Sequence, residues 1–336
     1  MTTLETPLTR LLDLDVPIVQ APMGGVAGPE LAAAVIRAGG LGMLGLSWTP
    51  AEQVEDQVRR TRDLAAGPLG ANLVLAWDQH DRVVACLEAG VDVLSFFWGD
   101  PEPYLPVLRA AEVKTMLTVG SAYEARRAVD QGIDVVVAQG VEAGGHVCGK
   151  VGTMVLVPAV VDAVAGRAPV VAAGGIADGR GLAAALMLGA SGAWLGTRFV
   201  ASREAQVPPE YQGAIMGAPE TDTVLTELFD GGWPAAPHRV LVSNLVRTWQ
   251  DAGCPPPGRR PGEGEVIGTG PDGHPIHRYD ADPPLAGMSG DWQACALYAG
   301  QSAGLIYEIL PAGEIVRRVV EDAKATIARW QARQGG

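Results

Sequence analysis

The sequence predicts an α/β protein built as a (β/α)8 TIM barrel, with a smaller α/β lid domain inserted after the eighth strand. Two observations carry this prediction. The strands are continuous apolar runs, which are typical of parallel strands buried on both faces. A helix end, a glycine stop and such a strand also recur along the first part of the chain, at 36–44, 87–94, 129–136 and 187–194. An open, doubly wound sheet is the alternative arrangement of the same repeats.

The barrel elements follow one another in order. Strands are expected at 17–20, 42–45, 70–74, 93–96, 114–118, 134–138, 170–173 and 192–195. Helices are expected between them, at 29–38, 54–64, 83–89, 123–129, 158–164 and 181–188. Pro29 suits the first turn of the first helix, because its fixed φ is already helical and its missing N–H would have no partner there. Eight repeats within about 200 residues fit a closed barrel better than an open sheet.

The repeat breaks after Ala201, which divides the chain into three expected parts. Residues 1–202 form the barrel, residues 203–291 form the inserted lid, and residues 292–336 return to the barrel as C-terminal helices. The insert is rich in proline, glycine and charge between 255 and 284. The elements expected outside the barrel are helices at 209–216, 240–249 and 314–334, and a hairpin within 265–279.

The bulk composition excludes several classes of protein. Of the 336 residues, 48% are hydrophobic, which excludes a disordered chain, and the net charge of −13 argues against nucleic acid or an anionic membrane as a partner. The four cysteines form no CxxC pair, and His274 and His277 have no other ligands nearby, so no metal site is expected. The sequence shows neither a signal peptide nor a run of about 18 apolar residues, so a cytoplasmic protein is expected.

The stretch from Gln139 to His146 follows the sixth expected strand and contains three glycines. Gly140, Gly144 and Gly145 let the backbone come close to a ligand. His146 lies beyond the C-terminal end of the strand, where an imidazole with an ordinary pKa of about 6.5 can exchange protons at neutral pH. The alternative interpretation is a glycine-rich connection with an incidental histidine.

Two other turns have the groups that a phosphate requires. Strand seven ends at Gly174 and Gly175, and strand eight ends at Gly196, Thr197 and Arg198. Bared N–H groups, a hydroxyl and a cation are common parts of a phosphate site, which barrels of this type often place after strands seven and eight. The same glycines also serve as the tight turns that every barrel needs.

The ends of other strands complete a candidate cofactor site. The segment 21–24 after strand one leaves room for a flat ring, and Asn72 in strand three can both donate and accept, as a heteroaromatic edge requires. Gln139 closes strand six, and Lys114 opens strand five, where it is either a cation toward the centre or a solvated strand end. An apolar mouth with these polar groups and a phosphate cradle predicts a mononucleotide cofactor.

Five stretches stand in register along the chain. They are PIVQAPM at 17–23, GANL at 70–73, QGVEAGGH at 139–146, AAGGIADG at 172–179 and YAGQSAG at 298–304. Together they resemble the nitronate monooxygenase family, also called 2-nitropropane dioxygenase, over nearly the whole barrel and the returning C-terminal segment. The resemblance implies an FMN-dependent oxygenase with a smaller α/β domain over the flavin.

The resemblance also implies roles for residues. His146 falls on the active-site histidine of the family, a base that removes the α-proton of a neutral nitroalkane, or a group that orients an ionised nitronate such as propionate 3-nitronate. The expected partners are that small molecule and O2, and a homodimer is compatible with the sequence. The residues and the resemblance together give these expected FMN contacts: Ala21, Pro22, Met23, Gly24, Asn72, Lys114, Gln139, Gly144, Gly145, Gly174, Gly175, Trp194, Leu195, Gly196, Thr197 and Gln301.

Rival functions remain open at this point. An FMN-dependent enoyl-[acyl-carrier-protein] reductase also keeps a Glu-x-Gly-Gly-His segment, and NAD(P)H:quinone reduction uses the same scaffold. A flavin-free isomerase of phosphate sugars and a non-catalytic binding module are more distant alternatives. Two features depart from the family pattern. Val147 and Cys148 stand where many relatives have an arginine, with Cys148 expected to be a small buried thiol, and the arm 255–284 is longer than the family leads us to expect.

Overall fold

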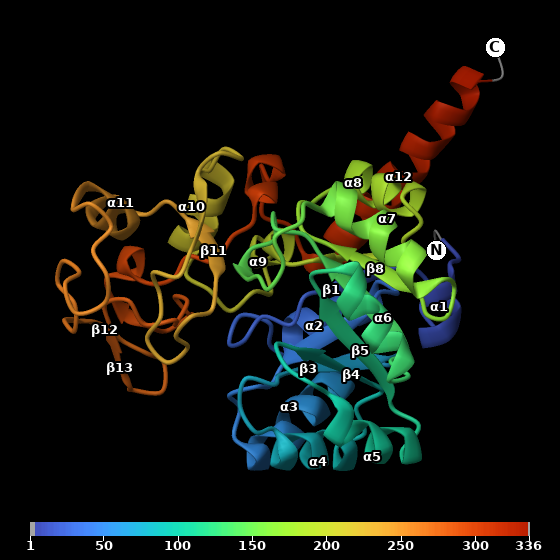
Figure 1. The fold of residues 1–336 in the computed structure, drawn as a ribbon, viewed down its shortest axis with the longest axis horizontal. Helices are drawn as coiled ribbons and strands as arrows, with labels where there is room; N and C mark the ends of the chain where they lie inside the picture. Colours follow the sequence, from blue (N-terminus) through green and yellow to red (C-terminus); the bar gives the residue numbers. More distant parts are fainter. Residues whose placement is uncertain (1–3, 335–336) are drawn as a thin grey trace.

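The computed structural model describes residues 4–334, with a parallel barrel on one side and the inserted segment beside it (Figure 1). In the sheet the strands are ordered β1-β9-β8-β6-β5-β4-β3-β2, and a parallel bridge between Val19 and Leu41 joins its two ends. The predicted barrel is therefore confirmed. Its strands are β1 (Ile18–Gln20), β2 (Gly42–Gly45), β3 (Leu69–Val74), β4 (Val93–Phe97), β5 (Lys114–Val119), β6 (Val135–Gln139), β8 (Val170–Ala173) and β9 (Gly192–Leu195).

Helices surround this barrel. They are α2 (Pro29–Arg37), α3 (Ala51–Leu64), α4 (His80–Glu88), α5 (Leu105–Ala110), α6 (Ala122–Asp130), α7 (Thr153–Val164), α8 (Gly179–Met187) and α12 (Ala312–Gln334). The last of these comes back after the insert and packs against α8 and α2, which completes the ring. The short helix α5 and the 3-10 turn η1 (Glu102–Tyr104) before it were not predicted, because six residues are too few to show helical periodicity. No helix within residues 4–334 is long and apolar enough to cross a membrane.

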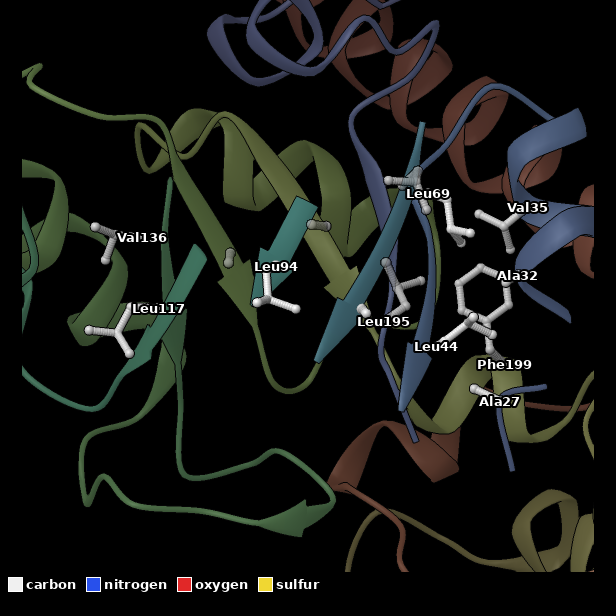
Figure 2. Close-up of a cluster of buried hydrophobic side chains, with 14 of the residues drawn as sticks. Ala27, Ala32, Val35, Leu44, Leu69, Leu94, Leu117, Val136, Leu195 and Phe199 are labelled. Carbon is white, nitrogen blue, oxygen red and sulfur yellow. The ribbon is translucent and has the colours of Figure 1, made fainter. Parts of the chain in front are cut away.

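Alternate residues of most barrel strands belong to two separate apolar clusters. Leu44 and Leu94 point outward into the layer between strands and helices, which Figure 2 shows. Met43 and Val93, their neighbours in sequence, point into the barrel interior. Helix α1 (Pro7–Leu12), which was not predicted, joins the inner cluster through Leu8 and Leu12. The barrel is thus a packed core, and its free end for chemistry is the one where the strands finish.

The insert forms two small sheets and two helices, α10 (Pro209–Gly217) and α11 (Asn244–Asp251). β12 (Val266–Thr269) pairs antiparallel with β13 (Pro275–His277), as the predicted hairpin requires, and also with β14 (Ser289–Gly290). β10 (Thr223–Thr226) pairs with β11 (His238–Leu241). The helix predicted at 240–249 is therefore wrong in its first part. It begins at Asn244, because the hydroxyl of Ser243 accepts from Val246 N–H and caps the helix there.

The chain leaves and re-enters the barrel at one point. The short helix α9 (Thr197–Val200) follows β9, and Ser202 then pairs with Leu310 in a parallel bridge. Residues from the 3-10 turn η2 (Trp292–Ala294) to the turn η3 (Gln301–Leu305) pack with apolar residues of the insert. We therefore propose that the inserted unit runs from Arg203 to Leu310, further than the boundary at 291 that the sequence suggests.

Candidate active site

The loops that follow the barrel strands meet η3 at the C-terminal end of the barrel. Gly144 and Gly300 approach so closely that a Cβ on Gly300 would lie 2.8 Å from the amide nitrogen of Gly144. The N–H of Gly300 donates to Thr197 Oγ1 at 2.9 Å, and the N–H of Gln301 donates to the carbonyl of Glu142 at 3.0 Å. The returning segment of the insert is thus fixed directly against the loops after β6 and β9.

The strand ends bring the predicted cofactor residues together at this end of the barrel, with one exception. Lys114 opens β5 beside Val93, at the opposite end of the barrel, and there lines a hollow of about 670 Å³ with Asp13 and Arg62. Because the first residue of a parallel strand lies at the N-terminal face, the predicted contact between Lys114 and the cofactor is wrong. The expectation of a buried thiol at Cys148 is also wrong, since that side chain is exposed.

The side chains of three other residues near the expected phosphate site differ from what the sequence suggests. The Leu195 side chain is buried in the main core, so only its backbone can face a ligand. Arg198 donates to the carbonyls of Ala201 and Glu308, and burial lowers the pKa of its guanidinium to about 10. Its hydrogen bond to Glu308 holds the returning segment in place, while its Nε is buried without a partner among the described residues. The Gln301 side chain is exposed.

His146 lies on β7 (Gly145–His146), a short strand that leaves the barrel and pairs with β11 of the insert. Aromatic rings enclose its imidazole: Trp233 stacks on it at 3.9 Å between centroids, and His238, Tyr298 and Trp98 lie at 5.3, 5.5 and 6.1 Å. Burial, with a smaller contribution from His238, lowers the pKa of His146 to about 3. The ring is therefore neutral at physiological pH.

Gln139 holds the histidine loop and also leaves a polar atom without a partner. Its Nε2 donates to the carbonyl of His146 at 3.1 Å. Gln139 Oε1 and His146 Nε2 are both buried and, within the described chain, have no hydrogen-bond partner. Leaving a buried polar atom unpaired costs about 1–3 kcal/mol. Two such atoms on one loop indicate a place where a ligand supplies the missing hydrogen bonds.

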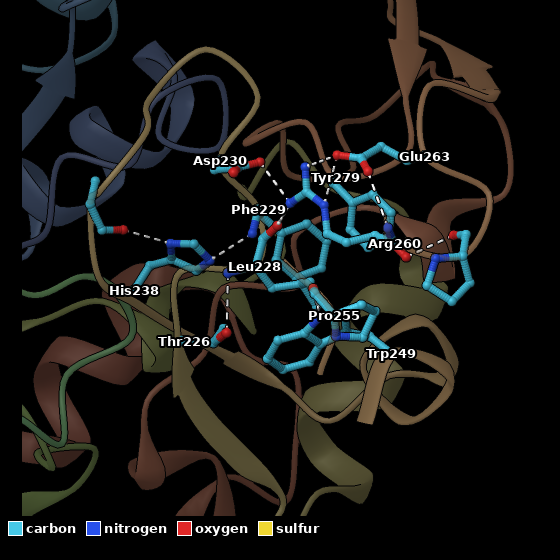
Figure 3. Close-up of polar contacts among 12 residues, drawn as sticks. Thr226, Leu228, Phe229, Asp230, His238, Trp249, Pro255, Arg260, Glu263 and Tyr279 are labelled. Atoms are coloured by element: carbon cyan, nitrogen blue, oxygen red, sulfur yellow. Dashed lines mark hydrogen bonds and ion pairs between the residues drawn. The ribbon is translucent and has the colours of Figure 1, made fainter. Parts of the chain in front are cut away.

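His238 closes the base of the loop that carries Trp233 (Figure 3). Its Nε2 accepts from the N–H of Phe229 at 3.3 Å, and its Nδ1 lies 2.9 Å from the carbonyl of Ala236. Since Nε2 accepts, Nδ1 must carry the proton and donate to that carbonyl. Burial lowers the pKa of His238, which keeps this neutral form in place. His238 therefore fixes both ends of the loop beside His146.

Four tryptophans near the histidine were missed by sequence reasoning. Trp48, Trp77, Trp98 and Trp233 contact one another through ring pairs with centroids between 4.9 and 6.1 Å apart. A signal was present, because the first three follow β2, β3 and β4 within three residues, in consecutive loops at the active end. Trp98 also has a φ of 61°, which is rare for a bulky side chain and is often found at functional sites.

A packed (β/α)8 barrel with a partly buried, neutral histidine and unpaired polar atoms at its strand ends defines a barrel enzyme whose site lies under an inserted domain. The family model for nitronate monooxygenase matches residues 5–83 and 75–322 of the chain. The chain belongs to the nitronate monooxygenase family and is an oxidoreductase.

Similar sequences include two kinds of enzyme. A (3aS,4S,5R,7aS)-5-hydroxy-7a-methyl-1-oxo-octahydro-1H-indene-4-carboxyl-CoA dehydrogenase from Rhodococcus jostii is 39% identical over 254 residues, which cover 75% of this chain and 70% of the relative. A probable nitronate monooxygenase from Staphylococcus saprophyticus is 31% identical over 375 residues, which cover 97% of this chain and 99% of the relative.

Two solved structures cover nearly the whole chain. FabK from Thermotoga maritima superposes with a TM-score of 0.85 at 34% identity, over 98% of this chain and all of that chain (100%). A nitroalkane oxidase from Streptomyces ansochromogenes superposes with a TM-score of 0.78 at 29% identity, over 97% of this chain and 100% of that chain. The fold of the insert as well as that of the barrel is therefore shared with both.

Proposed function

We propose that this protein oxidises alkyl nitronates or nitroalkanes with O2, using bound FMN, and that His146 is the base or anion-orienting group. The observation that carries the proposal is the neutral imidazole of His146, whose Nε2 is buried without a partner at the strand ends. Family membership and the likeness to a nitroalkane oxidase support the same reaction class.

The residues present fit an FMN cofactor. Gln139 Oε1 is a buried acceptor without a partner, which suits the ring N–H of a flavin. A Cβ on Gly145 would meet no atom within 4 Å, so this backbone borders open space. The backbone at Gly174–Gly175 and Gly196–Thr197 would hold the phosphate. When bound, FMN supplies the electron acceptor for the oxidation.

His146 would act on the proton of the substrate. For a neutral nitroalkane, the C–H bond breaks, its electron pair stays on the nitronate, and the proton goes to His146 Nε2. The low pKa leaves the Nε2 lone pair free at neutral pH but makes the ring a weak base, so proton transfer depends on the negative charge of the nitronate formed beside it, which raises the pKa of the imidazole. It also argues against an imidazolium in the free enzyme. The surrounding rings exclude water, which strengthens polar interactions with the substrate.

The test compares two forms of one substrate. In His146→Asn, kcat/KM for neutral nitroethane should fall by about 10²- to 10⁴-fold, because proton abstraction loses its base. For preformed ethylnitronate the fall should be less than about tenfold, since that proton is already gone. O2 uptake measures both reactions, and the flavin content of the variant checks the fold. His80→Asn, on the exposed start of α4, is the matched control. An equal loss of kcat/KM for nitroethane and ethylnitronate would contradict the role of His146 as a base.

A nicotinamide-linked reductase or dehydrogenase is the second candidate. The specific observations in its favour are the 39% identity to the Rhodococcus CoA-ester dehydrogenase and the TM-score of 0.85 with FabK. The candidates differ in the electron donor, since nitronate oxidation takes electrons from a nitronate, a reductase takes them from NADH or NADPH, and a dehydrogenase takes them from its own substrate. Reduction of the bound flavin by each donor therefore separates them.

A further inference from the structure

The four tryptophans Trp48, Trp77, Trp98 and Trp233 form one continuous surface, called here the tryptophan wall. Trp77 lies 4.9 Å and Trp98 5.2 Å from Trp233 between ring centroids, and Trp48 packs on Trp77 at 5.7 Å. Trp48 is 54% exposed and Trp77 is 37% exposed, while Trp233 is 7% exposed and stacks on His146. The wall therefore leads from solvent to the proposed base.

The wall borders the expected cofactor loop as well as the histidine. A Cβ on Gly24, in the loop after β1, would lie 3.1 Å from the ring of Trp48. Exposed large aromatic side chains that gather beside a site commonly mark a ligand surface, because leaving them in water is unfavourable. A molecule that reaches both His146 and this loop therefore has to lie against the wall.

The wall is apolar along its length. Among residues 4–334, the cation over an aromatic ring is Arg260 on Tyr279, which lies in the insert. Arg82 is the cation near the base of Trp48, and its Nε already donates to the carbonyl of Thr49 at 2.7 Å. The tryptophan wall therefore favours contact with an apolar group of a ligand over contact with a carboxylate.

Trp233 stacks on the face of the His146 ring, whose Nε2 is buried, so we expect Trp233 to move when a ligand reaches this atom. Its loop is fixed at the base by His238, and Arg260 donates to the carbonyl of Leu228 just before it at 2.8 Å. Between these anchors, Gly232 has a φ of 84° and no atom within 4 Å of an added Cβ. Gly231 beside it exchanges hydrogen bonds with Tyr279 and Ala281, so the loop backbone is held and a displacement of Trp233 would be a rotation of its side chain.

We propose that the tryptophan wall binds an aromatic or fused-ring group carried next to the reacting carbon of the substrate, and that Trp233 moves aside so that this ring stacks beside His146. The reaction part rests on the proposed nitronate oxidation, whereas the ligand chemistry of the wall does not. Burying one phenyl group against apolar surface should raise kcat/KM by about 10- to 100-fold.

The kinetic test uses the holoenzyme and two nitronates that differ by one phenyl group, those of 1-nitro-2-phenylethane and nitroethane. The wild type should prefer the phenyl compound by about 10- to 100-fold in kcat/KM. Trp77→Ala and Trp48→Ala, both at exposed positions, should each reduce this preference by several-fold. Trp330→Ala, at an exposed tryptophan of α12, is the matched control and should keep it. Equal kcat/KM values for the two nitronates in the wild type would overturn the proposal.

A binding test separates the wall from the reaction. The probe is 3-phenylpropionate, whose carboxylate resembles a nitronate but does not undergo the oxidation. Propionate, which lacks the phenyl group, and choline, a cation, are compared with it. Tryptophan fluorescence should show at least about tenfold tighter binding of 3-phenylpropionate than of propionate, and weaker binding in Trp77→Ala. If the protein oxidises no nitronate but binds this probe, the wall stands and the proposed function fails. Binding of choline in preference to the probe would overturn the proposal for the wall.

Discussion

The low pKa of His146 makes stability fall in mild acid by an amount that can be worked out. The unfolded chain has a histidine pKa of 6.5, whereas burial lowers the folded value to about 3. Below pH 6.5 the unfolded chain binds a proton that the folded chain does not bind. The stability from this group is therefore fully present above pH 6.5 and is lost as the pH falls toward 3. At pH 5, the loss is about 2 kcal/mol, at about 1.4 kcal/mol per pH unit.

Urea unfolding of the wild type and of His146→Gln at pH 7 and pH 5 measures this effect. The wild type should lose about 2 kcal/mol more than the variant between the two values. His238, whose pKa is also lowered by burial, is present in both proteins, so the comparison isolates His146. His80→Gln, at an exposed position, should behave as the wild type does. The same loss in the wild type and in His146→Gln would refute the argument that His146 is buried in its neutral form.

Three further predictions follow from the same geometry. Trp233→Ala should hydrate His146 and raise its pKa from about 3 toward 6.5, so the acid limb of the pH profile of kcat/KM moves upward; an unmoved limb would contradict burial as the cause. Gly300→Ala puts a Cβ 2.7 Å from a backbone carbonyl and should cost about 1–3 kcal/mol in urea unfolding, whereas Gly213→Ala, with open space on α10, should cost nothing. Lys114→Met should leave the flavin content of the purified protein unchanged, and a loss of flavin would restore the contact rejected above.

The barrel could be predicted because each repeat has its own local signal. A glycine that ends a helix and a continuous apolar run placed all eight strands within one or two residues of their observed bounds. The insert was harder, since β11 pairs with β7 and β10 and, through Val240, with Tyr298, and these partners lie elsewhere in the sequence. Local pattern alone therefore assigned part of β11 to a helix.

In the candidate site, too, features that depend on local pattern could be predicted and features that depend on long-range packing could not. The direction of parallel strands was enough to place the loops after β1, β6, β8 and β9 together, and it also shows why Lys114, at the start of β5, could not join them. The enclosure of His146 depends on Trp233 of the insert packing against loops of the barrel. Such long-range packing leaves no periodic pattern in the sequence, so neither the low pKa nor the tryptophan wall could be predicted.

The electron donor tests the central claim most directly. The purified holoenzyme would be mixed without oxygen, once with ethylnitronate and once with NADH or NADPH, while the flavin absorbance near about 450 nm is followed. Nitronate oxidation predicts rapid bleaching by the nitronate and none by the nicotinamides on the same timescale. Rapid and complete bleaching by NADH or NADPH, with no change on mixing with the nitronate, would contradict it and identify a reductase.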